Sequence, residues 1–506
     1  MSSKLLGIDV GTGGTRAVLI DRDGRVLASR TSEHASFASP QTGWAEQNPH
    51  DWWRACGEAI RQLLARSNTS PSDIACVGFS GQMHGAVILD AQGEVLRPAL
   101  IWCDQRTAAE AEELTRTIGE SEIIERTCNP ALTNFTLTKL LWVRRHEPEL
   151  FARFRTLLLP KDYVRYRLTG SYGMDVADAS GTLLLDVANR RWSLAMAKSA
   201  DIDVDTLPPL FECADVCGKV SAAGAAATGL LEGTPVVAGA GDQAAGAVGL
   251  GVVKPGAVHA TIGTSGVVFA STDRPALDPK GRLHTFCHAV RDRWHVMGVT
   301  QAAGLSLRWF RDNFGATTTD SRDIYERLTE EAARVPAGSD GVFWAPYLMG
   351  ERTPHLDPNA RAALIGLAAN HHRGHIIRAI LEGVAFSLRD TFAIFDEMDV
   401  PVSNIRLGGG GARSELWRQI QADVYGHSVE IVEAEEGAAY GAALLAGVGA
   451  RIWPTVDAAC EVVRVQRTVA PDPRTSEVLQ RSYQTYRRIY PALRAIQNYS
   501  SVTTVA

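Results

Sequence analysis

Residues 5–24 read LLGIDVGTGGTRAVLIDRDG, and this stretch determines how the rest of the chain is interpreted. An apolar run ends at Asp9 and is followed by a turn of glycine and threonine. An alternating apolar segment then leads to Asp23-Gly24, which is a typical hairpin turn. The pattern predicts three strands, over 5–9, 16–21 and 25–30, that form a β-meander.

The glycine- and threonine-rich turn after Asp9 has a second possible use. Glycine lacks the Cβ that would block a close approach, so successive backbone N–H groups and threonine hydroxyls can point at a phosphate. The nearby carboxylate could hold Mg²⁺ through water. For one such turn alone, a plain β-hairpin is the better interpretation.

The same pattern returns about half a chain later. Ile262-Gly263-Thr264-Ser265-Gly266 precedes another predicted strand, as residues 10–14 do near the start. A duplicated domain would explain the repeat, and the order of strands and helices in the chain predicts an α/β fold. Two such turns could hold a polyphosphate from both sides.

A third glycine-rich turn lies in the second half of the chain. Gly408 to Gly411 stand between a predicted strand over 405–407 and a predicted helix over 412–425. A sharp turn between a strand and a helix seldom needs four glycines, so a flat ligand lying on bare backbone explains them better. Apolar spacing predicts further helices over 375–395 and in an amphipathic tail over 476–496.

Asp242 follows an apolar run over 235–240. Open α/β sheets bind their ligands at the carboxyl ends of buried strands, and there Asp242 could accept a proton from a substrate hydroxyl as a general base. Aspartate also favours the N-cap of a helix, and both roles are compatible. The same residues match the G-x-G-x-x-A dinucleotide pattern, but no acidic residue occurs between 244 and 272, so that alternative is set aside.

The histidines allow several interpretations. Met83-His84 follows a predicted buried strand over 74–79, and on pattern alone a core or turn position is favoured. The spacing of His371, His372 and His375 would suit a metal, but an acidic partner set is missing. His284, Cys287 and His288 are also interpreted as structural. The sequence contains no G-x-x-x-x-G-K-S/T and no G-x-S-x-G, which excludes a P-loop enzyme and argues against an α/β-hydrolase.

Composition narrows the class of protein further. Hydrophobic residues make up 45% and charged residues 21% of the 506 positions, as in globular proteins. The net charge of −6, without a long basic run, argues against nucleic acid and against a membrane as partner. The eight cysteines include no C-x-x-C pair, and the first residues contain no apolar signal segment. We therefore expect a cytoplasmic protein with reduced thiols.

Taken together, these segments resemble the FGGY family of carbohydrate kinases. The resemblance runs from about Leu6 to Gly447 and includes GIDVGTGGTRAVLID (7–21), GFSGQMHGAVILD (78–90), LLPKDYVRYRLTG (158–170), GAGDQAAGAVGLG (239–251) and GGGGARSELWRQIQAD (408–423). It implies the actin-like ATPase fold, an α/β fold with two RNase H-like domains around a central cleft. The expected domains are residues 1–248, which bind sugar and phosphate, and residues 249–506, which bind the nucleotide and end in a helical tail.

The resemblance also implies a reaction. It indicates transfer of the γ-phosphoryl group of ATP to a small-molecule sugar with the help of Mg²⁺, and it is strongest to members that phosphorylate O5 of D-xylulose. By motif match, we expect Asp242 to be the catalytic base and Asp9 to lie near Mg²⁺ and the transferred group. The residues expected at the sugar are Met83, His84 and Gln243, and those expected at the phosphates and the adenosine are Thr12, Gly13, Thr264, Ser265, Gly410, Gly411 and Glu415.

Three positions depart from the family pattern. Gln243 and Glu415 each replace an asparagine of some relatives, and Asn134 stands where a small or aromatic residue is usual. A related kinase for another ketose, polyol or sugar acid therefore remains an alternative. A catalytically silent actin-like nucleotide-binding regulator is a second one, although the presence of both Asp9 and Asp242 argues against it. A homodimer is a family-level expectation.

Overall fold

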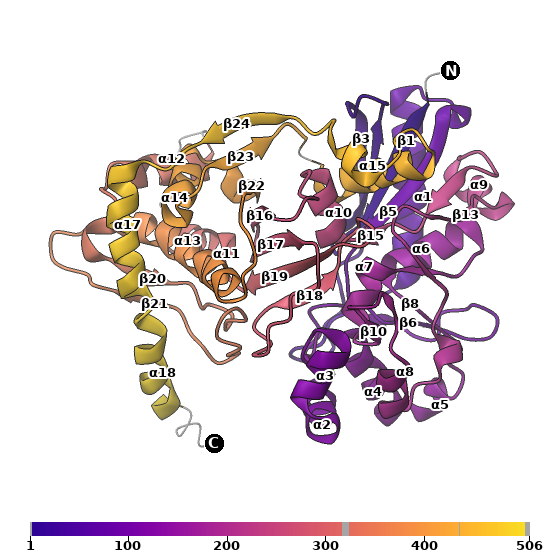
Figure 1. The fold of residues 1–506 in the computed structure, drawn as a ribbon, viewed down its shortest axis with the longest axis horizontal. Helices are drawn as coiled ribbons and strands as arrows, with labels where there is room; N and C mark the ends of the chain where they lie inside the picture. Colours follow the sequence, from indigo (N-terminus) through magenta and orange to yellow (C-terminus); the bar gives the residue numbers. More distant parts are fainter. Residues whose placement is uncertain (1–2, 316–322, 435, 501–506) are drawn as a thin grey trace.

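The computed structural model describes residues 3–315, 323–434 and 436–500. Its chain forms two lobes, and each lobe is built around a seven-stranded β-sheet (Figure 1). Helices and strands alternate along the chain in both lobes, so the predicted α/β class is confirmed. Among the described helices, none combines the length and the apolar character that crossing a bilayer requires.

The first sheet contains the predicted β-meander. The strands β1, β2 and β3 are antiparallel neighbours, whereas β5 and β1 run parallel and β15 extends the sheet beside the end of β5. Parallel β1, β5 and β15 all end at the same edge of the sheet. The order across the sheet is β13 (Val216–Lys219), β14 (Pro235–Val237), β5 (Ile74–Gly81), β1 (Lys4–Val10), β2 (Gly14–Ile20) and β3 (Val26–Glu33), with β15 (Ala240–Gly241) paired to β5.

The second sheet repeats part of this arrangement. β16 pairs antiparallel with β17 and parallel with β22, as β1 does with β2 and β5. The turn between β16 and β17 therefore corresponds to the turn between β1 and β2, which agrees with the repeat in the sequence. The order across the sheet is β18 (His284–Cys287), β19 (Trp294–Thr300), β17 (Gly266–Thr272), β16 (Ala257–Ile262), β22 (Asn404–Gly409), β23 (Val429–Val432) and β24 (Val465–Val469).

Helices cover both sheets. In the first lobe, α1 (Pro49–Ser67) packs on β2 and β3, and α6 (Pro160–Thr169) packs on β1 and β5. In the second lobe, α13 (Arg373–Glu397) packs on β17 and β19. The other helices with described ends are α2 (Ala108–Ile118), α3 (Glu120–Thr127), α4 (Thr136–His146), α5 (Pro148–Phe151), α7 (Val176–Ala179), α8 (Leu194–Ser199), α9 (Ala222–Thr228), α11 (Gly304–Phe314), α12 (Ile324–Ala333), α14 (Glu415–Tyr425) and α16 (Val456–Cys460).

Short strand pairs complete the structure, and the tail is divided into two helices. The predicted amphipathic tail over 476–496 is helical, in two pieces, α17 (Pro473–Tyr486) and α18 (Ile489–Ser500). α17 packs on α14, and the first turn of α18 packs on the body through Tyr490, whose ring stacks on His355 at 3.5 Å, before the helix extends away (Figure 1). The strand pairs are β4 (Glu46–Gln47) with β7 (Ala99–Leu100), β6 (Val87–Leu89) with β8 (Thr156–Leu158), β9 (Met174–Asp175) with β12 (Leu210–Phe211), β10 (Leu185–Asp186) with β11 (Arg191–Trp192), and β20 (Phe343–Ala345) with β21 (Ala363–Ile365).

Two helices pack together where the lobes meet. α15 (Gly437–Gly449) comes from the second half of the chain, yet it packs on β1 and β5 of the first sheet and on α10 (Asp242–Gly249). The contact is made by backbone, because a Cβ at Gly441 would lie 1.8 Å from the Ala245 carbonyl oxygen. A larger residue cannot enter without separating the helices. Close packing therefore fixes the start of α10, where Asp242 stands.

A buried stack of alternating phenylalanine and histidine rings also joins the lobes. Phe135 of the first lobe contacts His284 with ring centroids 5.5 Å apart, and Phe269 stacks on His295 at 4.1 Å and on His259 at 4.7 Å. Burial lowers the pKa of His259 to about 3, so its ring is neutral at physiological pH. His284, Cys287 and His288 are buried in the same region, which confirms their structural interpretation.

The stack leads to a testable pH dependence. The pKa of His259 is about 3 in the folded state and near 6.5 in the unfolded chain, so its contribution to stability is complete above pH 6.5 and is lost as the pH falls below it. His259→Phe removes this dependence. Relative to the parent, the free energy of unfolding of the variant should increase by about 1.4 kcal/mol for each pH unit below 6.5.

Urea unfolding of both proteins at about pH 7.5 and about pH 5.5 measures this difference. Phe395→Leu is a matched control, since it changes a fully buried ring without a titratable group. Its stability difference from the parent should be the same at both pH values. An equally constant difference for His259→Phe would show that the ring is not held neutral by burial.

Candidate active site

Two acidic residues lie at the edge where β1, β5 and β15 end. Asp9 pairs with Ser80 across the parallel strands β1 and β5. On the other side of β5, Ala240 of β15 pairs with the same Ser80. Asp242 directly follows β15 and is the first residue of α10. The shared partner strand thus brings Asp9 and Asp242 to one edge of the sheet, although they are far apart in the sequence.

Burial governs the charge of both carboxyl groups. Burial and, to a smaller extent, the negative charge of Asp9 together raise the pKa of Asp242 to about 7. Gln243 works against this shift, because its Nε2 donates a hydrogen bond of 3.2 Å to Asp242 Oδ1. The pKa of Asp9 is also raised by burial, while Ser80 and Arg16 lower it. At neutral pH the Asp242 carboxyl group can therefore gain or lose a proton.

Asp9 has room for a further partner. Its Oδ1 atom is buried and has no hydrogen-bond partner of acceptable geometry among the described residues. A divalent cation or its bound water would satisfy such an oxygen, so the site fits Mg²⁺. Within the same residues no group of three side chains is arranged to hold a metal ion. Mg²⁺ commonly binds through one or two carboxylates and the phosphates of a substrate, which agrees with this arrangement.

The turn after β1 is held from several sides. Trp102 Nε1 donates a hydrogen bond of 2.9 Å to Thr12 Oγ1, and Gln47 Nε2 donates one of 2.7 Å to the Thr12 carbonyl oxygen. Gly13 is exposed, and no atom lies within 4 Å of the position where its Cβ would stand. The turn is therefore fixed at Thr12 and open at Gly13, which suits a phosphate that approaches the backbone.

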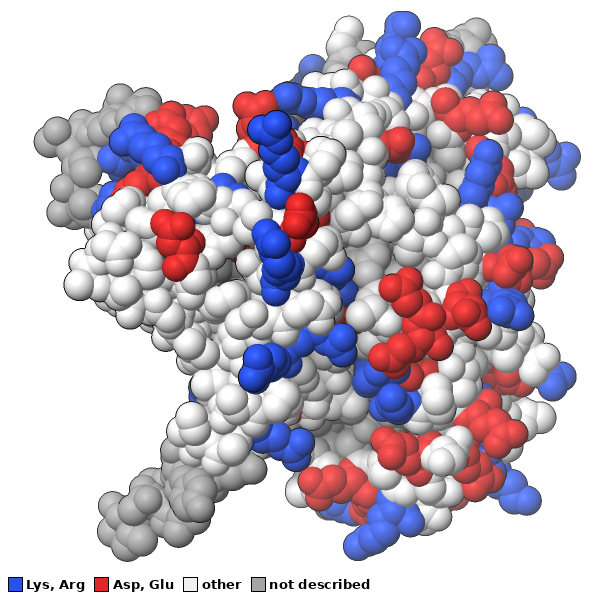
Figure 2. Space-filling view, turned by 60° about the vertical axis from the view of Figure 1, so that its left-hand side comes forward, with Lys and Arg blue, Asp and Glu red and all other residues white. Residues whose placement is uncertain are grey.

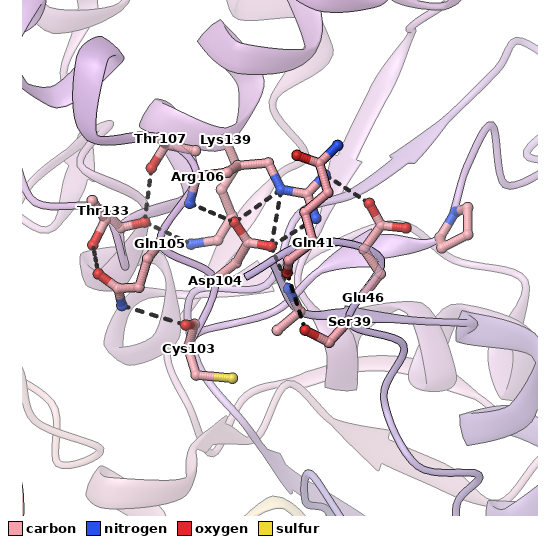
Figure 3. A network of polar contacts seen from close by, with 12 residues as sticks. Ser39, Gln41, Glu46, Cys103, Asp104, Gln105, Arg106, Thr107, Thr133 and Lys139 are labelled. Atoms are coloured by element: carbon pink, nitrogen blue, oxygen red, sulfur yellow. Dashed lines mark hydrogen bonds and ion pairs between the residues drawn. The ribbon is translucent and has the colours of Figure 1, made fainter. Parts of the chain in front are cut away.

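A polar network holds the segment that carries Trp102 (Figure 3). Arg106 forms ion pairs with Asp104 at 2.8 Å and with Glu46 at 2.7 Å, and its guanidinium group lies 3.6 Å from the centre of the Trp44 ring. Asp104 also accepts a hydrogen bond from the backbone of residue 45. These buried contacts anchor Trp102 beside Thr12. Sequence analysis did not identify this network, because its members come from three separate segments.

A cavity of about 480 Å³ lies in the second lobe and includes parts of two predicted turns. Thr264 borders it from the turn after β16, and Gly410 and Gly411 border it from the turn after β22. The second turn requires glycine, because a Cβ at Gly409 would lie 2.5 Å from the Ile262 carbonyl oxygen. Bare backbone thus lines one wall of this cavity.

Sequence analysis missed other residues of this cavity. Arg308 lies on α11, and its Nη2 atom is 3.5 Å from Thr264 Oγ1. Trp417 and Tyr325 supply aromatic surface to the same cavity. A local signal for Arg308 was present, since Gly304 begins α11 shortly after β19, much as Gly408 to Gly411 stand between β22 and α14.

Two predicted nucleotide residues lie elsewhere. Ser265 belongs to the turn after β16 but does not line the cavity. The Glu415 side chain is 76% exposed and forms an ion pair of 2.7 Å with Arg467 on β24. The structure therefore brings Thr264, Gly410 and Gly411 together but directs Glu415 to the surface.

Met83 lies beside the start of α10, and His84 follows it in the chain. A Cβ at Gly241 would stand 3.2 Å from Met83 Sδ, so the thioether packs on the residue before Asp242. His84 has a positive φ of 66°, and its Nδ1 donates a hydrogen bond of 2.8 Å to the Gly181 carbonyl oxygen. Its Nε2 is then an acceptor and lies 3.3 Å from Asn134 Nδ2. Asn134, which departs from the family pattern, thus orients the His84 ring.

Basic side chains stand at the hollow between the two lobes. Figure 2 shows Lys and Arg side chains, in blue, along it, with a group of Asp and Glu side chains, in red, next to them. The Lys and Arg side chains can attract anions such as nucleotide phosphates.

Comparison with known proteins agrees with this arrangement. Residues 4–249 match the N-terminal domain of the FGGY family of carbohydrate kinases, and residues 258–450 match its C-terminal domain. The chain is 39% identical to a xylulose kinase of Bacillus subtilis, with 96% of each protein covered. It is 38% identical to a xylulose kinase of Escherichia coli, with 96% of this chain and 99% of that protein covered.

Solved structures support the same assignment. A crystal structure of xylulose kinase from Rhodospirillum rubrum superimposes with a TM-score of 0.90 at 31% identity, covering 98% of this chain and 100% of the other. The expected actin-like fold of two α/β domains is thereby confirmed. From the two domain matches and the full-length similarity, we conclude that this chain belongs to the FGGY family of carbohydrate kinases.

Proposed function

We propose that this protein transfers the γ-phosphoryl group of ATP to O5 of D-xylulose and releases D-xylulose 5-phosphate and ADP. The observation that carries the proposal is the position of Asp242, a half-buried carboxyl group at the strand edge that also holds Asp9 and the Thr12 turn. Full-length similarity to proteins named xylulose kinase supports the choice of sugar.

Asp242 acts as the general base. Its carboxylate accepts the proton of the sugar hydroxyl while the hydroxyl oxygen forms its bond to phosphorus. A pKa near 7 suits this task, because such a group is partly ionised at neutral pH and still basic enough to accept a proton. Met83 packs beside the residue before Asp242, and Gln243 donates a hydrogen bond to Asp242. In this proposal these two residues and His84 orient the sugar.

The nucleotide is bound mainly by the second lobe. In this proposal the adenosine occupies the cavity bordered by Gly410 and Gly411, and Arg308 and Thr264 face its phosphates. The Thr12–Gly13 turn contacts the terminal phosphate from the first lobe. When bound at Asp9, Mg²⁺ would neutralise charge on the transferred phosphoryl group. Residues 1–248 and 249–506 then form the sugar and nucleotide domains, respectively.

One observation supports testing acceptor substrates other than D-xylulose. The Gln243 amide donates to Asp242 Oδ1, so part of its hydrogen-bonding capacity is used within the protein. A different ketose, a polyol or a sugar acid could fit the remaining space better, since a few hydroxyl contacts determine selectivity. A cytoplasmic location and a homodimer stay predictions.

Asp242→Asn tests the role of the base. The amide is similar in size but cannot accept the proton, so kcat should fall by about 10²–10⁴-fold. ADP release with D-xylulose, glycerol and gluconate as acceptors measures activity, and calorimetric titration with ADP checks that the nucleotide site is intact. Near-normal turnover by the variant would remove Asp242 from this role. If none of the acceptors stimulated ADP release by the parent protein, a catalytically silent nucleotide-binding regulator would be favoured.

A pair of variants tests the division between sugar and nucleotide. His84→Ala should raise the KM for the sugar, because the ring borders the residues that orient it, and should leave the KM for ATP almost unchanged. Arg308→Ala should do the opposite by removing a cation next to Thr264. Steady-state kinetics with each substrate varied in turn provides the readout. The reverse pattern would show that the sugar and nucleotide sites are assigned the wrong way round.

A further inference from the structure

A group of buried charges lies behind the sugar side of the site. Lys161 on α6 forms ion pairs with Asp162 at 2.7 Å, with Asp175 at 2.6 Å and with Asp178 at 3.1 Å. All four side chains have 0% exposure. Arg165 is the other cation of this group and lies 3.4 Å from Asp162. Lys161 is therefore the cation that holds Asp175 and Asp178.

Such an arrangement is costly to build. Charged side chains lose their hydration when buried, and the loss is repaid only by close pairing. Removal of one partner leaves the others uncompensated. Asp178 Oδ1 still lacks a hydrogen-bond partner among the described residues. This group of two cations and three carboxyl groups is larger than a single structural ion pair. Its place in the fold suggests that it positions a neighbouring segment.

The segment that Lys161 holds contacts β15, the strand directly before Asp242. Asp175 caps α7, since its Oδ1 accepts a hydrogen bond of 2.9 Å from the Asp178 backbone N–H. Asp178 Oδ1 would lie 3.2 Å from a Cβ at Gly241, the residue before Asp242. α7 also packs on β15. The position of α7 therefore limits where the start of α10 can lie.

The same segment supports His84. The Gly181 carbonyl oxygen accepts the hydrogen bond from His84 Nδ1 at 2.8 Å and a second from Thr136 Oγ1 at 3.4 Å. Ser180 Oγ accepts a hydrogen bond of 3.0 Å from the backbone of Cys287 in the second lobe. Residues 175–182 thus contact the supports of both the base and the sugar-side histidine.

We propose that Lys161 is a positioning residue, which fixes residues 175–182 through Asp175 and Asp178 and thereby sets the distance between Asp242 and His84. This inference rests on the proposed function. Lys161 touches neither substrate nor Asp242 directly. Its effect is on the geometry in which the sugar hydroxyl meets the base.

Lys161→Met tests this role, because methionine fills a similar length without a charge. We expect kcat to fall and the KM for the sugar to rise, by about 10- to 100-fold together in kcat/KM, since small misplacements of reacting groups have effects of this size. The affinity for ADP, measured by calorimetric titration, should stay within about twofold because the nucleotide cavity lies in the other lobe.

Arg378→Met provides the matched control. Arg378 forms a buried ion pair of 2.6 Å with Glu382 within α13, in the second lobe. Both variants should lower the melting temperature, but only Lys161→Met should change the sugar kinetics. If both changed kcat/KM for the sugar equally, the effect would be a general loss of stability and the positioning role would be wrong.

A second variant covers the case in which Lys161→Met does not fold. Asp175→Asn keeps the size of the side chain and its capping oxygen but removes the charge that Lys161 binds. It should fold and lower kcat/KM for the sugar in the same direction. A folded variant with kinetics within about twofold of the parent would overturn the proposal. If the parent itself phosphorylates no sugar, the proposed function fails instead.

Discussion

Two carboxyl groups at one edge of a sheet are the constraint on which the rest of the site depends. Burial, together with the nearby charge of Asp9, raises the pKa of Asp242 to about 7. Two buried acids are unfavourable together unless a cation or a proton compensates them. The buried oxygen of Asp9, which has no hydrogen-bond partner in the described part of the chain, suits a metal ion, and the Lys and Arg side chains along the hollow in Figure 2 suit phosphate. The cost of burying these acids is thus linked to the binding of substrate.

The duplicated fold supplies the same turn twice but the acid only once. β1 and β16 each pair antiparallel with the next strand and parallel with a distant one, and each ends in a glycine-rich turn. Asp9 stands next to the end of β1, whereas Thr261 stands at the corresponding place in β16. In the proposed function, the first lobe accordingly supplies the base and the metal ligand, and the second lobe supplies bare backbone to the nucleotide. The glycine contact between α10 and α15 holds the two lobes together at Asp242.

Local patterns were sufficient to predict much of the fold. The meander, the three glycine turns and α13 follow from apolar spacing and turn residues within short windows. Asp242 could be found because a strand end followed by aspartate is itself a local signal. The resemblance to a family supplied the remaining expected residues, and the structure brings only some of them together. Thr264, Gly410 and Gly411 meet at one cavity, whereas Glu415 turns to Arg467, a partner on a strand more than fifty positions later.

What the sequence did not reveal depends on contacts between distant segments. Lys161 and Arg308 look like ordinary surface cations in a linear pattern, and only the packed chain shows one fully buried and the other beside Thr264. The positive φ of His84 also results from tertiary structure.

A crystal structure with D-xylulose and a non-hydrolysable ATP analogue tests the central claim most directly. The account predicts O5 at about 2.6–3.2 Å from the Asp242 carboxylate, with the terminal phosphate between the Thr12 and Thr264 turns. A sugar bound with every hydroxyl remote from Asp242 would contradict it.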